Sequence, residues 1–241
     1  MRLSYFSSNL ETALKARSNA VSLSWTINLL LTPTFSSILD ESQTGNSAEI
    51  ISLVNFFSGK KSSISLTKQV PGLNNVRAGL SWDSQTINGK EADADVSVFM
   101  LDANSKIPSE GYFVFYNNLK SADGSVLHNG DARAGDADGD DESVNITLSK
   151  ISPDINFILL AVSIHNSNEG FNFGNTKNAK IRLFNEDNGV QICEFKLMEE
   201  HPDADSIIIG SFFRGEQGEW KFEAMVNSFN EGLQACLQVY S

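Results

Sequence analysis

Short segments of alternating apolar residues, separated by turn-forming dipeptides, fill this sequence from Ser62 to its end. Alternation with a period of two is the pattern of a β-strand that buries one face. Asn-Gly and Asp-Gly pairs supply the positive φ angles that hairpin turns require. The predicted strands are 76–82, 96–101, 112–116, 144–148, 157–164, 179–184, 192–197, 207–213 and 220–226, and the turn pairs begin at Asn88, Asp123, Asn129, Asp138 and Asn188. About ten short strands with such turns predict an all-β protein, a β-sandwich or a barrel.

Two segments depart from the simple one-faced pattern. Residues 96–101 carry apolar side chains on both faces, so this strand is expected to be buried on both sides. Residues 229–240 place Leu233, Leu237 and Tyr240 at spacings of four and three, which predicts a short helix at the C-terminal end of the domain.

Composition narrows the class of protein. The chain has 241 residues, 41% of them apolar, which is enough for a sizeable core, and a formal net charge of −12. This charge argues against nucleic acid and against anionic membrane surfaces as partners. The apolar run 25–31 is too short to insert across a bilayer. Cys193 and Cys236 lack metal-ligand spacing and are expected to be core thiols in a cytoplasmic protein.

The first fifty residues differ from the rest. They are rich in Ser, Thr and Asn, and they lack the basic start, apolar core and small-residue cleavage site of a signal peptide. We therefore expect residues 1–50 to be a weakly ordered extension and residues 51–241 to form the β-domain.

An acidic run is the main candidate for a functional site. Residues 130–145 read GDARAGDADGDDESVN. The acidic residues of this run are Asp131, Asp136, Asp138, Asp140, Asp141 and Glu142. Such a density of like charge is unfavourable unless it is solvated or neutralised. Flexible glycines and hard oxygen ligands suit Ca²⁺. The alternative is a solvated loop, but the strand that follows favours an ordered loop with a bound cation.

The run does not follow the EF-hand pattern. With Asp136 as the first ligand, position six is Asp141 instead of Gly and position twelve is Thr147 instead of Glu. A second acidic cluster, Glu91, Asp93 and Asp95, leads into the strand 96–101, and Asp93 and Asp95 are two residues apart. Their spacing of two points both side chains to one side, where they need a shared partner or water. The alternative is a solvated strand end.

Evidence for catalysis is weak. No serine lies in a GxSxG motif, and the sequence near Lys60 fails the phosphate-loop pattern. A metal-dependent hydrolase or transferase remains the alternative, because the paired motifs Asp93/Asp95 and Asp138/Asp140 are able to hold a metal and a phosphate-bearing substrate. His165 closes an apolar strand, and we expect a hydrogen-bonded residue there rather than a ligand of a hard ion.

Several ordered motifs carry a resemblance to a known family. GLSWD (79–83), DADVSVFML (93–101), FVFYNNLKSADGSVLHNGD (113–131), DGDDE (138–142), ILLAVSIH (158–165), IRLFNEDNG (181–189) and GEWKFEAM (218–225) occur in this order. Over residues 60–240 the chain resembles the TerD family of tellurium-resistance and stress proteins.

This resemblance implies a β-sandwich of two mostly antiparallel sheets that binds calcium in the cytoplasm without established catalytic activity. It implies other stress or tellurium-resistance proteins as partners. The ligands that it implies are Asp93, Asp95, Asp131, Asp138, Asp140, Asp141 and Glu142, with Asp83 and Asn117 as weaker candidates. The family commonly has Asn where this chain has Ala132, so one amide ligand is expected to be missing and the affinity of one of two sites to be reduced.

Overall fold

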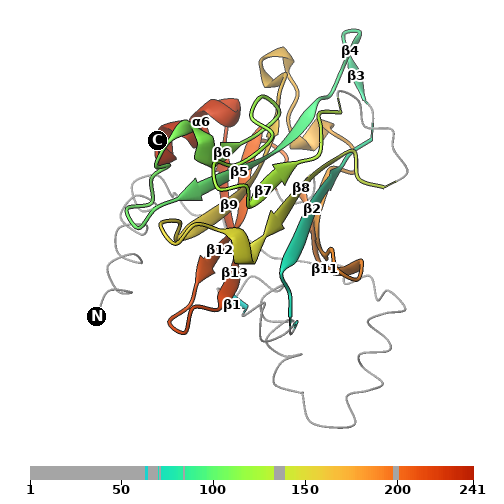
Figure 1. The fold of residues 1–241 in the computed structure, drawn as a ribbon. Coiled ribbons are helices and arrows are strands. Elements are labelled where there is room, and N and C mark those ends of the chain that lie inside the picture. Colours follow the sequence, from blue (N-terminus) through green and yellow to red (C-terminus); the bar gives the residue numbers. More distant parts are fainter. Residues whose placement is uncertain (1–62, 65–69, 71, 84, 133–138, 198–200) are drawn as a thin grey trace.

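The alternating segments form strands, and these strands pair into two antiparallel sheets (Figure 1). The computed structural model describes residues 63–64, 70, 72–83, 85–132, 139–197 and 201–241. The six-stranded sheet has the order β1 (Ser63–Ile64), β13 (Trp220–Phe229), β12 (Ser206–Arg214), β9 (Phe157–Ile164), β5 (Ala94–Leu101) and β6 (Phe113–Val114). The five-stranded sheet has the order β11 (Val190–Lys196), β10 (Lys180–Asn185), β2 (Asn75–Ser81), β8 (Glu142–Thr147) and β7 (Val126–His128).

Smaller elements lie outside the two sheets. β3 (Thr86–Ile87) and β4 (Lys90–Glu91) form a separate hairpin whose turn contains Asn88 and Gly89, both at positive φ. The 3₁₀ helices are η2 (Glu110–Tyr112), η3 (Leu148–Lys150), η4 (Ser167–Glu169) and η5 (Phe173–Asn175), and the α-helix is α6 (Gly232–Tyr240). The prediction of an all-β sandwich with a short C-terminal helix is confirmed.

The main core lies between the sheets. Val76, Ala78 and Leu80 of β2 and Val96 and Val98 of β5 are fully buried in it. Period-two alternation explains this burial, because these residues occupy every second position of their strands.

A second core covers the opposite face of the six-stranded sheet. Phe99 and Leu101 of β5 pack there with Cys236 and Tyr240 of α6, and Figure 1 shows this helix beside the sheet. The expected two-sided burial of β5 is therefore confirmed, as is the core position of Cys236. Cys193 is also buried, in the main core.

Some expectations lie outside the described residues. The proposed boundary at residue 50 and the extension 1–50 belong to them, so both stay predictions. None of the helices in the described part of the chain combines the length and apolar character that a membrane crossing requires.

Candidate metal centre

Three carboxylates converge where β5 begins. One oxygen from each of Asp93, Asp95 and Asp131 lies within 4.8 Å of the others. Among the described residues, this is the group of His, Cys, Asp or Glu side chains that lie close enough together to hold a metal ion. Asp95 is 2% exposed, Asp93 is half-buried and Asp131 is exposed. The site is therefore buried on the side of Asp95 and open to solvent on the side of Asp131.

Strand geometry brings these residues together. β5 begins at Ala94, so Asp93 and Asp95 point to the same side, as their spacing predicts. Asp131 follows the end of β7 by three residues and reaches the site from the other sheet. His128 links the segment that carries Asp131 to β5. Its Nδ1 accepts a hydrogen bond from the backbone N–H of Gly130 at 3.2 Å, and its Nε2 lies 3.2 Å from the backbone oxygen of Val96. These partners fit a neutral imidazole that carries its proton on Nε2.

The buried carboxylate of Asp95 lies among other acidic side chains. Burial, with the negative charges of Glu142, Asp93 and Asp131, raises the pKa of Asp95 from 3.8 to about 8. Among the described residues, no donor forms a hydrogen bond with Oδ2 of Asp95. A buried carboxylate in this position needs a proton or a cation.

Two aromatic residues stand at the mouth of the site. Nδ1 of His165 lies 3.6 Å from Oδ2 of Asp95, and its ring meets Tyr116 edge-on with a centroid distance of 5.2 Å. Burial and the negative charges of the three carboxylates raise the pKa of Tyr116. The sequence predicted a hydrogen-bonded role for His165. The structure places its imidazole beside the carboxylates without a hydrogen bond to Asp95.

Glu142 lies beneath this group and has protein partners. Its Oε2 accepts a hydrogen bond from the backbone N–H of Val96 at 3.0 Å, and its Oε1 accepts one from that of Ala132 at 3.2 Å. The side chain is completely buried. One carboxylate thus joins the residue after Asp95 to the residue after Asp131.

Asp140 lies on the outer face of the five-stranded sheet. Its carboxylate forms ion pairs with Arg77 of β2 and Arg182 of β10, and Nε of Arg182 donates to Oδ1 at 3.1 Å. Gly79 lies directly beneath, and a Cβ at that position would overlap the Asp140 carboxylate. The guanidinium of Arg77 stacks on Phe184 at 4.2 Å from the ring centroid.

The remaining predicted ligands are placed as follows. Asp141 Oδ2 accepts a hydrogen bond from the backbone N–H of Trp82 at 3.0 Å. Oδ2 of the exposed Asp83 accepts one from Asn178 Nδ2 at 2.6 Å. Neither belongs to the three-carboxylate group, and Asn117 is an exposed residue. Asp136 and Asp138 lie outside the described residues.

The three carboxylates fit a hard divalent cation. They offer up to six anionic oxygens, and Ca²⁺ takes about six to eight oxygen ligands in a tolerant geometry. The open side of the site leaves room for water to complete the shell. Carboxylates of Asp93, Asp95 and Asp131 would hold the ion, and the buried Asp95 oxygen that accepts no hydrogen bond from the described protein is the observation that supports this fit.

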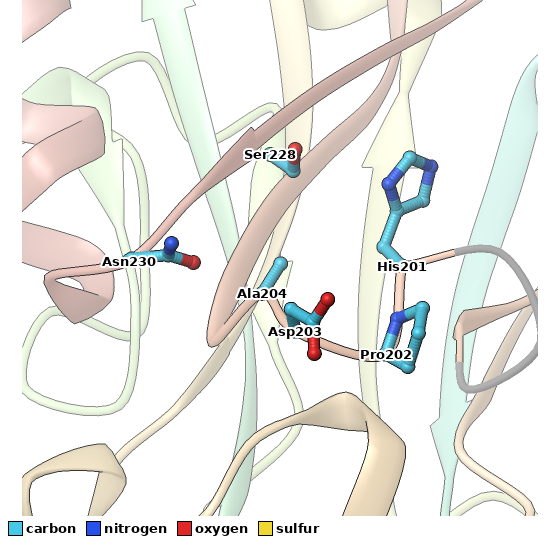
Figure 2. Close-up of a pocket in the computed structure, with 6 residues that line it drawn as sticks. All are labelled: His201, Pro202, Asp203, Ala204, Ser228 and Asn230. Atoms are coloured by element: carbon cyan, nitrogen blue, oxygen red, sulfur yellow. The ribbon is translucent and has the colours of Figure 1, made fainter. Parts of the chain in front are cut away.

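A separate polar hollow of about 240 Å³ lies near the end of β13. Figure 2 shows its lining residues, His201, Pro202, Asp203, Ala204, Ser228 and Asn230. Binding pockets for small organic ligands are usually larger and mostly apolar. None of the predicted ligand carboxylates lines it.

Comparison with known proteins finds relatives that match most of the chain. The chain is 40% identical over 182 residues to a tellurium resistance protein TerD of Alcaligenes, covering 75% of this chain and 94% of that protein. It is 39% identical over 176 residues to general stress protein 16U of Bacillus subtilis, covering 72% and 91%.

Solved structures share the fold. A crystal structure of a homologue of the telluride resistance protein TerD from Streptomyces coelicolor superposes with a TM-score of 0.61 at 21% identity, covering 69% of this chain and 96% of that one. The sequence model of the TerD domain matches residues 58–240. With identities near 40% over nearly the whole length of curated relatives and a matching family model, the chain belongs to the TerD domain family.

Proposed function

We propose that this protein is a calcium-binding, non-enzymatic stress-response protein of the tellurium-resistance type. The names of its relatives, which include tellurium resistance and general stress proteins, support the biological role. The calcium proposal rests on one observation: Asp95 is buried beside two other carboxylates, and no described residue donates a hydrogen bond to its Oδ2.

The ion would act on stability and on surface charge. Binding to the folded state alone stabilises it by about 2.7 kcal/mol when free Ca²⁺ exceeds Kd by about a hundredfold. Neutralising the carboxylates would also order the acidic loop. That loop would then present a surface to other stress or tellurium-resistance proteins.

A calcium titration tests the proposal. Protein freed of metal with a chelator is titrated with Ca²⁺ by isothermal calorimetry, and its melting temperature is measured with and without the ion. We expect saturable binding and a higher melting temperature, and loss of both in Asp95→Asn. Asp83→Asn is the matched control, because this exposed residue lies outside the three-carboxylate group. Absence of binding heat and of a melting shift at millimolar Ca²⁺ would discard the proposal.

The partner surface needs its own test. Capture of a tellurium-resistance protein by the wild type in Ca²⁺, but not in chelator and not by folded Asp95→Asn, would support a calcium-dependent surface. Equal capture under all three conditions would count against it.

The structure gives the hydrolase or transferase alternative no support. That hypothesis uses Asp93/Asp95 and Asp138/Asp140 as paired metal motifs. Asp140 is instead bound by two arginines on the outer face of a sheet, and Asp138 lies outside the described residues. These two arginines are thereby engaged by a carboxylate of the protein itself.

A further inference from the structure

Residues 140–142 of the acidic run carry three carboxylates, each of which contacts a different part of the protein. Asp140 pairs with arginines on the outer face of the five-stranded sheet, Asp141 binds the backbone of Trp82, and Glu142 reaches the floor of the metal centre. We infer that Asp140 and Glu142 are positioning residues, which set the cation affinity of the Asp93, Asp95 and Asp131 site without touching the ion. The inference rests on the proposed cation site.

Glu142 acts closest to the ligands. Its two oxygens accept hydrogen bonds from the backbone amides of Val96 and Ala132. Each of these residues directly follows a ligand, Asp95 on β5 and Asp131 after β7. A single buried carboxylate therefore fixes the separation of two ligand-bearing segments that come from different sheets.

Asp140 fixes Glu142 in turn. It lies two residues before Glu142, and its side chain is only 9% exposed despite its position on an outer face. Arg77 is itself held in place, because it stacks on Phe184 and its Nε donates to Glu186 at 2.8 Å. We call Asp140, Arg77, Arg182 and Gly79 the arginine latch.

Gly79 gives the latch its shape. Arg182 pairs with Gly79 across the β2–β10 ladder, and Arg77 lies two positions before Gly79 on the same face of β2. The missing side chain at residue 79 leaves the space in which the Asp140 carboxylate lies between the two guanidinium groups. Even a single methyl group there would displace it.

A positioning role of the latch and a purely electrostatic effect predict opposite changes in Ca²⁺ affinity when an arginine is removed. Arg182 carries a positive charge, and its removal lowers the repulsion of a nearby cation, so electrostatics alone predicts tighter Ca²⁺ binding. If the arginine instead holds the ligand segments in register, its removal weakens binding. Loss of a residue that orients metal ligands typically costs about ten- to hundredfold in affinity.

The experiment measures Ca²⁺ affinity by calorimetry in Arg182→Gln and in Lys180→Gln, with the full chain. Lys180 lies two residues earlier on the same face of β10, so its substitution removes the same charge outside the latch. We expect Arg182→Gln to bind about tenfold more weakly or worse, Lys180→Gln to bind like the wild type, and Arg182→Lys to recover part of the loss.

Gly79→Ala provides a second variant without any change of charge. We expect weaker Ca²⁺ binding while the melting temperature in chelator shows a folded protein, which separates positioning of the ligands from general loss of stability. Wild-type or tighter affinity in folded Arg182→Gln and Gly79→Ala would overturn the inference. Failure of the wild type to bind Ca²⁺ would instead overturn the proposed function, so the two failures are distinguishable.

Discussion

Nδ1 of His165 lies 3.6 Å from Oδ2 of Asp95, and the imidazole side chain is 50% exposed while the carboxylate is 2% exposed. The ring thus stands between the buried oxygen and solvent, with Tyr116 edge-on beside it. Under the proposed function, Asp95 is the residue through which pH and Ca²⁺ concentration would change the stability of the domain.

The stability of the metal-free protein should fall as pH rises. Burial and neighbouring carboxylates raise the pKa of Asp95 from 3.8 to about 8. Between these values the folded protein holds a proton that the unfolded chain has lost, so unfolding becomes easier with increasing pH. This one group contributes at most about 1.4 kcal/mol per pH unit. Urea unfolding in chelator at about pH 6 and about pH 8 measures the effect.

The matching variant isolates this group. Asp95→Asn cannot ionise at this position, so the decline of unfolding free energy between the two pH values should be smaller than in the wild type. An equal decline in both proteins would contradict the assignment to Asp95. Calcium should raise the melting temperature of the wild type more at the higher pH, because fewer protons then compete for the carboxylate.

Asp123 should stabilise the fold independently of metal. Its Oδ1 accepts hydrogen bonds from Ser121 Oγ and from the backbone of Ser125, and its Oδ2 accepts one from the backbone of Ser152. Partial burial raises its pKa, but these hydrogen bonds outweigh burial and lower it below 3.8. Its contribution is therefore present above that value and is lost as pH falls through the folded-state pKa.

Replacing this residue tests the network. Asp123→Ala should lower the unfolding free energy at neutral pH by about 2 kcal/mol, because several donors lose one acceptor. The exposed Asp154 is the control, and Asp154→Ala should change stability by no more than about 0.5 kcal/mol. Ca²⁺ affinity should be unchanged in both variants, and an equal loss of stability in the control would refute the role of Asp123.

Both thiols should be unreactive in the folded protein. Burial raises the pKa of Cys236 to about 11 and that of Cys193 further, and the thiolate is the reactive form. Ellman's reagent or tellurite added to native protein should modify neither cysteine, and both should react once denaturant unfolds the chain. Rapid modification of the native protein would show that a tellurium species has access to these thiols.

Much of the fold could be predicted because alternation is a local signal. The strand predicted at 157–164 matches β9, and β2, β8 and β10 differ from their predictions by one or two residues at either end. The predicted strand 112–116 is shorter, because Asn118 Nδ2 donates to the backbone oxygen of Phe113 at 2.6 Å and closes a turn there. β7 was missed because it has only three residues and exposes Leu127.

The metal centre was predictable only in part. Asp93 and Asp95 could be paired from their spacing, and Asp131 from the family resemblance. The ion pairs of Asp140 could not be predicted from the sequence. Its partners Arg77 and Arg182 lie 63 and 42 residues away along the chain, and sheet pairing brings them to it. His128 carried no signal beyond its place before a turn.

A crystal structure of the protein grown in Ca²⁺ tests the central claim most directly. The account predicts an ion bound by oxygens of Asp93, Asp95 and Asp131 at about 2.3–2.6 Å, with Asp140 still held between Arg77 and Arg182. Three carboxylates turned toward solvent with no ion among them, at a Ca²⁺ concentration that saturates known sites, would contradict it.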